Sequence, residues 1–192
     1  MKTLFTLALS TIALVFAGNA DAKAADYEFD TVHSQIIFKV NHLGYSNSYG
    51  KFRAFDGTLS FDPEDWSTAK TEVSINTKSI DLENKKWNDH MRNPDFFDVE
   101  QYPAMTFKST KLEKTGEDTG KLHGDLTILD KTLPITLDLT LNQAGIHPMS
   151  EQPHVGFSAT GTIKRSEWGM IYGVPAVGDE VDIIIEVEAT AR

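Results

Sequence analysis

The feature that most constrains this chain is a period of two in its hydrophobic residues, repeated in most segments between residues 34 and 190. In residues 133–141 an apolar side chain occupies every odd position, and a polar residue or proline occupies every even one. Successive side chains of a β-strand point to opposite faces, so this pattern buries one face of a strand and exposes the other. Such strands are typical of antiparallel sheets, because parallel strands are buried on both faces and have continuous apolar runs.

About eight such strands are expected, joined by turn residues such as those at 115–118 and 130–131. The expected ranges are 26–30 with 34–42, 52–61, 71–77, 104–113, 120–129, 132–142, 154–164 and 180–190. Short links between successive strands predict a meander, which closes its edges most simply as an all-β, eight-stranded antiparallel barrel. A β-sandwich predicts the same alternation and is the alternative architecture.

Three segments lie outside this pattern. Residues 82–92 show no alternation and are expected to form a short helix, with Asp81 as its N-cap and Pro94 forcing its end. A helix there can plug one end of the barrel. Residues 143–153 are polar and are expected to form a surface loop. Residues 165–178 are rich in apolar side chains, so that loop must fold over the barrel mouth or face a partner.

The first 24 residues have the layout of a secretory signal peptide. Lys2 precedes an uncharged run that extends to Ala17, and small residues follow it. The run is too short for a comfortable membrane span, and an A-x-A pattern ends at Ala24. We therefore expect cleavage after Ala24 and an exported protein with one domain, residues 25–192.

The composition excludes several kinds of chemistry. The chain has no cysteine, which removes disulfides, thiolate metal sites and a cysteine nucleophile. Its formal net charge of −10 argues against a nucleic-acid partner. The six histidines form no H-x-H or H-x-x-x-H pair, and only His42 and His90 are placed to reach an interior. We therefore expect neither metal nor cofactor nor catalysis, and an undetected hydrolase or isomerase around His42 and His90 is a remote alternative.

The interior of an eight-stranded barrel is either filled by side chains or holds one small ligand. The residues expected to point inward mix bulky and small side chains, namely Phe38, Phe55, Phe61, Phe107 and Phe157 with Gly57, Gly124, Ala159 and Gly161. This mixture suits close packing and a tapered lumen equally well. The natural guest of such a lumen is a long apolar chain, since burial from water contributes about 0.8 kcal/mol per CH₂ group.

A set of motifs in a particular order resembles the YceI-like polyisoprenoid-binding proteins. The motifs are HLGYS at 42–46, GKF at 50–52, FDG at 55–57, DHMR at 89–92, DFFD at 95–98, TFKS at 106–109, GDLT at 124–127 and VDI at 181–183. The resemblance covers residues 25–192. It implies a lipocalin-like antiparallel barrel in the periplasm, without enzymatic activity, that holds an isoprenoid chain such as a polyprenyl phosphate or an isoprenoid quinone.

The resemblance also implies which residues form the site. The stretch 42–46 and the helix 84–92 line or close the ligand channel, and Arg92 is a partner for a phosphate head group. Together with inward strand positions and the apolar loop, the expected ligand-binding residues are Phe38, His42, Tyr45, Phe55, Trp87, His90, Met91, Arg92, Phe97, Trp168 and Tyr172.

The expected partners follow from the same reading. The first is an isoprenoid lipid, collected or delivered through transient contact with a membrane or a membrane protein, and the apolar loop permits a homodimer. The alternative function is a protein-interaction module that docks through residues 165–178.

Overall fold

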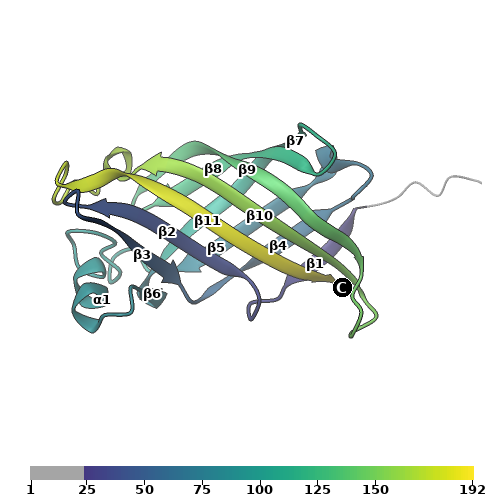
Figure 1. Cartoon of the computed structure of the whole chain (residues 1–192), viewed down its shortest axis with the longest axis horizontal. Helices are drawn as coiled ribbons and strands as arrows, with labels where there is room; N and C mark the ends of the chain where they lie inside the picture. Colours follow the sequence, from purple (N-terminus) through teal and green to yellow (C-terminus); the bar gives the residue numbers. More distant parts are fainter. Residues whose placement is uncertain (1–23) are drawn as a thin grey trace, which may run out of the picture.

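The computed structural model describes residues 24–192, which form one elongated β-barrel with a short helix at one end (Figure 1). The expected signal peptide lies outside the described residues, except for Ala24. The strands are β1 (Ala25–Phe29), β2 (Gln35–His42), β3 (Ser46–Phe52), β4 (Phe55–Phe61), β5 (Lys70–Asn76), β6 (Ile80–Asp81), β7 (Ala104–Lys114), β8 (Thr119–Ile128), β9 (Lys131–Ile146), β10 (Pro153–Lys164) and β11 (Val177–Ala191). The α-helix α1 spans Lys85–Met91, and the 3-10 helices are η1 (Trp66–Thr68), η2 (Thr77–Ser79) and η3 (Arg165–Trp168).

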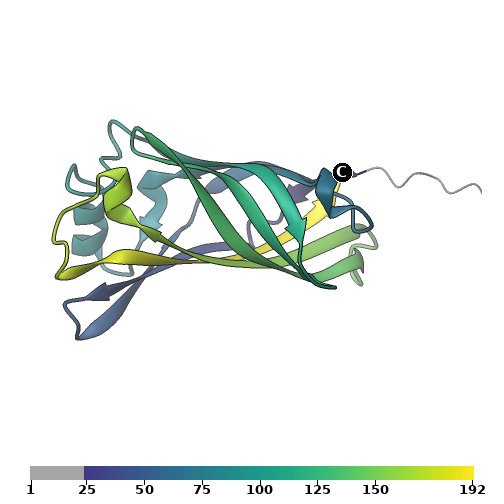
Figure 2. The same cartoon turned by 90° about the horizontal axis from the view of Figure 1, so that it is seen from above.

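Eight strands form a closed antiparallel ring. Their order is β1-β4-β5-β7-β8-β9-β10-β11, and β11 pairs back onto β1 through Ala189–Ala191. This closure confirms the barrel and excludes the sandwich. The remaining strands extend one end, because β11 pairs with β2 along its earlier residues, β2 pairs with β3, and β3 pairs with β6. The β2–β3 hairpin flares outward at the end that carries α1 (Figure 2).

Two expected boundaries were wrong. The strand expected at 52–61 begins only at Phe55, because the chain changes neighbours at residues 53–54: Phe52 ends β3, which pairs with β2 and β6, whereas β4 pairs with β1 and β5. The loop expected at 143–153 is shorter, because β9 continues to Ile146 and stays paired with β10 despite its polar side chains. A register shift between Gly156 and Phe157 accommodates this extension.

The short helix expected at 82–92 is confirmed, but its cap is different. The side chain of Asn84 accepts hydrogen bonds from the backbone N–H groups of Lys86 and Trp87, at 3.0 and 3.2 Å, so Asn84 is the N-cap. Asp81 instead accepts from the backbone N–H of Glu83, at 2.8 Å, and from the side chains of Asn88 and Arg53, at 3.1 and 2.6 Å. Its carboxylate thereby links β6 to α1 and to the connection between β3 and β4.

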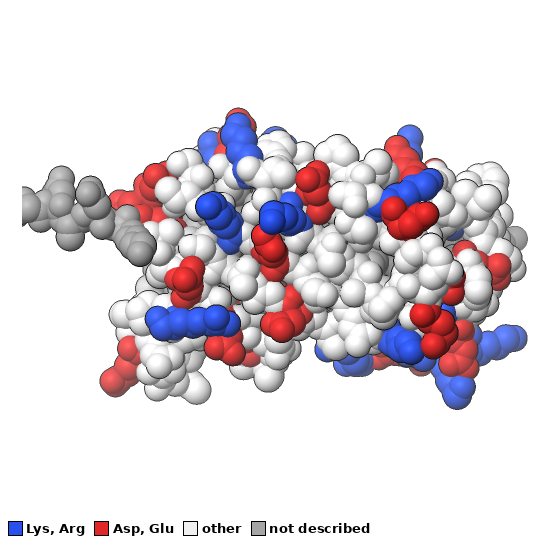
Figure 3. All heavy atoms as spheres, turned by 180° about the vertical axis from the view of Figure 1, so that it is seen from behind, with Lys and Arg blue, Asp and Glu red and all other residues white. Residues whose placement is uncertain are grey.

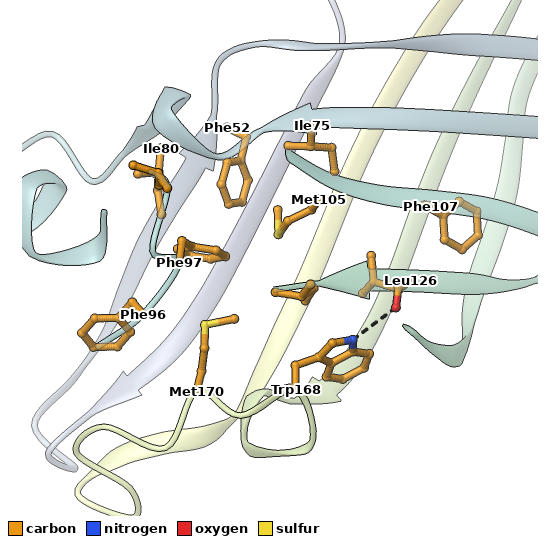
Figure 4. Close-up of a cluster of buried hydrophobic side chains, with 12 residues drawn as sticks. Phe52, Ile75, Ile80, Phe96, Phe97, Met105, Phe107, Leu126, Trp168 and Met170 are labelled. Carbon is orange, nitrogen blue, oxygen red and sulfur yellow. Dashed lines mark hydrogen bonds between the residues drawn. The ribbon is translucent and has the colours of Figure 1, made fainter. Parts of the chain in front are cut away.

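The two ends of the barrel are closed differently. At the end opposite α1, the ring of Trp66 in η1 is buried and packs against Phe61, with ring centroids 5.7 Å apart. Phe61 in turn packs edge-to-face on Phe157, at 5.0 Å. This buried aromatic cluster closes the far end of the barrel. At the α1 end, a second cluster includes Phe52, Phe97, Met105, Trp168 and Met170 (Figure 4).

The polar face of the alternation forms the outer wall. Acidic and basic side chains are interspersed on the face seen in Figure 3, with uncharged surface between them. Within residues 24–192, no helix has the length and apolar character needed to cross a membrane.

Candidate binding site in the barrel lumen

The barrel encloses a cavity of about 420 Å³. One water molecule needs only about 10–15 Å³ measured in this way, and sites for small organic ligands span roughly 300–1,000 Å³. The interior of the barrel is therefore hollow. The sequence was compatible with a packed interior and with an open lumen, and the structure has the open lumen.

The wall of the cavity is almost entirely apolar. Polar side chains among the lining residues are confined to His42, Ser48, Lys70, Thr71, Trp87, His90, Ser109, Arg165, Tyr172 and Glu186. Within the described residues, every buried side-chain nitrogen or oxygen already has a hydrogen-bond partner. The wall thus offers no unpaired buried polar group to a guest, and it favours a ligand whose inserted part is hydrocarbon.

Two glycines explain how bulky inward residues leave the lumen open. A Cβ atom added to Gly50 would lie 2.3 Å from Cζ of Phe38, and one added to Gly124 would lie 2.3 Å from Cζ of Phe107. Each ring occupies the space that a side chain on the neighbouring strand would take. The rings therefore lie against the wall, and the volume along the barrel axis stays free.

Aromatic rings from three parts of the chain meet at the α1 end. His42 on β2 lies 5.9 Å from Trp87 on α1, between ring centroids. His90, also on α1, lies 5.2 Å from Tyr172 in the loop after η3, and Phe96 lies 5.5 Å from the same tyrosine. All five residues line the cavity, so this cluster forms its mouth.

The loop over the mouth is held by one buried cation, Arg165. Its guanidinium donates hydrogen bonds to the backbone carbonyls of Met170, Tyr172, Val177 and Gly178, at 2.7, 2.9, 3.0 and 2.8 Å. Burial lowers the pKa of Arg165 from its ordinary value, and the nearby carboxylate of Asp179 acts in the opposite direction. Arginine remains charged in proteins despite such a shift, so these are charge-assisted bonds.

Most of the residues expected at the site lie on the cavity wall. They are Phe38, His42, Phe55, Trp87, His90, Met91, Phe97 and Tyr172. Their role in binding a ligand stays a prediction, but the fold brings them together around one space.

The other three expected residues do not line the cavity. Tyr45 lies in the turn between β2 and β3 and is 92% exposed. Trp168 is buried, and its indole N–H donates to the carbonyl of Leu126 at 3.1 Å (Figure 4). Arg92 donates to the backbone carbonyls of Lys78 and Ile80, at 2.9 and 3.0 Å, so its guanidinium holds η2 and β6 against the end of α1. The guanidinium of Arg92 therefore does not face the lumen, where a head group would lie.

The apolar loop 165–178 folds inward in part. Trp168 and Met170 are buried at the end of the barrel, whereas Ile171 and Tyr172 are 68% and 50% exposed. Sequence reasoning missed Arg165, although it lies inside the same segment. It also assigned no role to the deep wall residues, among them Leu139, Phe157 and Ile185, which the alternation had marked only as inward.

Comparison with known proteins agrees with this architecture. Residues 27–189 match the sequence model of the YceI-like domain. Protein YceI of Escherichia coli O157:H7 is 38% identical over 188 residues, which cover 97% of each chain. The crystal structure of BcnA from Burkholderia cenocepacia superposes with a TM-score of 0.77 at 28% identity, covering 85% of this chain and 100% of that one. A polyisoprenoid binding domain from Saccharophagus degradans shares the fold, with a TM-score of 0.69 at 15% identity over 88% of this chain and 100% of that one.

Proposed function

Because this chain belongs to the YceI-like family, we propose that it binds the hydrocarbon chain of an isoprenoid lipid in the barrel lumen and carries it in the periplasm. The observation that supports this most directly is the hollow lumen of about 420 Å³ with its apolar wall. The polyisoprenoid binding domain that shares the fold has the corresponding ligand class in its name. Polyprenyl phosphates and isoprenoid quinones are the candidate lipids.

The energetics of such a site suit a carrier. Removing a hydrocarbon chain from water contributes about 0.8 kcal/mol per CH₂ group, so a bound lipid is strongly protected from release into water. Transfer of the same chain from a bilayer into the lumen gains almost nothing, because both environments are hydrocarbon. The protein can therefore collect and return its ligand at a membrane, with selectivity set by shape and by polar groups at the mouth.

The ends of the barrel set the orientation of the ligand. Since Trp66 and Phe61 seal the far end, the chain enters at the α1 end and the head group stays at the mouth. The polar side chains at the mouth include those of His42, His90 and Tyr172. We propose these three residues, in place of Arg92, as the contacts of the head group.

The mouth also carries exposed apolar side chains suited to contact with a membrane. Leu43 and Tyr45, in the β2–β3 turn, are 48% and 92% exposed, and Ile171 in the neighbouring loop is 68% exposed. The backbone N–H of Leu43 donates to the carbonyl of Ala176, which places the turn beside that loop. Tyrosine favours the membrane–water interface, so this end is where we propose transient contact during loading.

Lipid extraction tests the proposal. Protein purified from its native host is extracted and the extract is analysed by mass spectrometry, for the wild type and for Ala159→Phe. Ala159 is 5% exposed and lines the lumen, so a phenyl ring there fills part of the cavity, whereas Thr160→Phe changes the exposed neighbour on the same strand. We expect an isoprenoid lipid in the wild type and in T160F, and its loss from folded A159F. Wild-type protein without a chain-like lipid, or folded A159F with its full lipid content, would contradict the proposal.

The alternative, docking of a partner protein through residues 165–178, now rests on Ile171 and Tyr172, because Trp168 and Met170 are buried. Ile171→Ser distinguishes the two functions. A docking module loses its partner in a pull-down, whereas a lipid carrier keeps a lumen that holds lipid and is slowed only in collecting that lipid from a membrane.

A further inference from the structure

Three neighbouring segments bring histidines and carboxylates together on the outer wall, at the end of the barrel opposite α1. His33 lies in the turn between β1 and β2, Glu188 lies on β11, and His154 lies on β10. The backbone N–H of Asp30 donates to the carbonyl of Glu188 at 2.9 Å, and His154 pairs with Thr190 in the β10–β11 register. Glu188 therefore stands between a histidine on each side, an arrangement that the sequence separations hide.

Glu188 lies close to the imidazole on each side of it. The ligand atoms of Asp30, His33 and Glu188 all lie within 4.8 Å of one another. Nε2 of His154 lies 3.2 Å from Oε2 of Glu188. Two ligands of a tetrahedral ion are separated by roughly 3.3 Å when each bond is about 2.0–2.1 Å long. This contact is a hydrogen bond when no ion is bound, and its length also equals the spacing of two adjacent ligands, so an ion that replaces the Nε2 proton fits between the imidazole and the carboxylate.

Hydrogen bonds orient both imidazoles for this role. Nδ1 of His33 lies 2.8 Å from Oδ2 of Asp30, and Nδ1 of His154 lies 2.9 Å from the hydroxyl of Thr190. A proton on Nδ1 that is donated to an oxygen leaves Nε2 as the ligand atom, which is the usual arrangement of metal-bound histidines. The hydroxyl of Ser34 bonds both the N–H and the carbonyl of Glu188, at 3.0 and 3.2 Å, and so fixes the turn that carries His33 against β11.

We propose that His33, His154 and Glu188 bind a divalent transition-metal ion of the Zn²⁺ type, with Asp30 supporting His33. Two imidazoles and one carboxylate suit Zn²⁺, whereas Ca²⁺ and Mg²⁺ prefer oxygen ligands alone. The space beside the cluster is open for a water ligand, because an added Cβ would meet nothing within 4 Å at Gly145 and nothing closer than 3.8 Å at Gly156. The His33 side chain is 63% exposed, which leaves its ring free to adjust to the ion.

A third histidine, His147, lies near the cluster but is not expected to be a ligand. The ring of His147 lies 5.0 Å from that of His154, between centroids. However, its Nδ1 accepts hydrogen bonds from the backbone N–H groups of Met149 and Ser150, at 3.3 and 3.2 Å. Its proton is therefore on Nε2, and neither nitrogen is available to an ion while the 147–152 loop keeps this conformation.

The position of the site suggests what the ion does. The ring of strands closes where β1 meets β11, and that seam has only the pairs Tyr27–Ala191, Glu28–Thr190 and Phe29–Ala189 among the described residues. An ion bound by His33, Glu188 and His154 links the turn after β1 to β11 and β10. It therefore acts as a clip across one of the two shortest seams of the ring, each of which has three residue pairs, and it lies outside the lumen.

Titration of the full-length mature protein, without an affinity tag, tests the site. ZnCl₂ binding is measured by isothermal titration calorimetry at pH 7.5, and CoCl₂ reports coordination through its visible absorption. We expect one ion per chain, an absorption spectrum of a four-coordinate Co²⁺ ion, and a dissociation constant raised at least about tenfold in His33→Ala, His154→Ala and Glu188→Gln. We also expect Zn²⁺ to raise the thermal midpoint of the wild type.

The controls separate this site from adventitious binding. His123→Ala removes a histidine on β8 whose side chain bonds Thr136 on β9, away from the cluster. His147→Ala removes the ring that lies beside His154. Both variants should bind Zn²⁺ like the wild type. Failure of Zn²⁺ to bind, binding that none of the three ligand variants weakens, or binding lost in H123A or H147A alone would overturn the proposal. His33 lies in an exposed turn, so H33A keeps the test valid if H154A fails to fold.

Discussion

Arg165→Met removes the cation that holds the loop over the lumen while keeping a side chain of similar length. Four backbone carbonyls lose their donor, namely those of Met170, Tyr172, Val177 and Gly178. Tyr172 is half-exposed, so its carbonyl can turn to water, whereas Met170 is buried. An unsatisfied buried polar group costs about 1–3 kcal/mol, and part of this is recovered because no cation has to be desolvated. We therefore expect the free energy of unfolding to fall by about 2–4 kcal/mol.

Urea denaturation followed by tryptophan fluorescence measures this change, since Trp168 lies within the loop and is buried. With a denaturant dependence of about 1–3 kcal/mol per M, the urea midpoint should fall by about 1–2 M in R165M. Arg165→Lys keeps the charge but not the planar set of donors, so its urea midpoint should lie between those of the wild type and R165M. Lys121→Met breaks an exposed ion pair with Asp138 and should leave the midpoint nearly unchanged.

A second measurement connects stability to the site. Because the loop carries Tyr172 over the cavity, R165M should release a bound lipid to acceptor vesicles several-fold faster than the wild type, whereas K121M should not. A midpoint in R165M that equals that of K121M would refute the reasoning, since the four carbonyls would then not depend on the guanidinium.

Two further predictions concern the wall and the end of the barrel. Gly124→Ala places a Cβ atom 2.3 Å from Cζ of Phe107, so the ring must move into the lumen and we expect reduced lipid content by mass spectrometry. Gly156→Ala is the control, because nothing lies closer than 3.8 Å to its added Cβ atom, and it should keep its lipid. The pKa of Asp81 is lowered from 3.8 to about 2, first by the backbone N–H of Glu83 and then by Asn88 and Arg53. A lowered folded-state pKa means that its contribution to stability is present above pH 4 and is lost as the pH falls toward 2, so urea midpoints should decline across that window in the wild type and less steeply in Asp81→Asn.

The sequence predicted the parts of the fold that depend on one strand at a time. Residues 132–142 alternate without interruption, and they form most of β9. Residues 46–52 escaped prediction because their sequence, SNSYGKF, has few apolar side chains, although backbone pairing with β2 still makes them a strand. Pairing that depends on the backbone rather than on side chains leaves no hydrophobic pattern to read.

The site was harder to predict because it depends on which residues oppose one another. Phe38 and Phe107 were expected to point inward, but their effect on the lumen depends on Gly50 and Gly124 lying beneath the rings, and that follows from the strand register. The two arginines show the same limit. Arg92 and Arg165 both lie near apolar residues, and both prove to bond backbone carbonyls, whose positions no side-chain pattern encodes.

The two ends of the barrel differ in how easily each can open. The far end is closed by packing of Trp66, Phe61 and Phe157, and opening it would expose large buried aromatic surfaces to water. The mouth is closed by a loop in which Ile171 and Tyr172 are already at least half exposed, and the carbonyl of Tyr172 that bonds Arg165 can turn to water at modest net cost. Local opening therefore occurs at the mouth long before the far end yields. In the proposed carrier, exchange of a lipid through the α1 end then requires only the movement of the loop, while the seam between β1 and β11 stays closed.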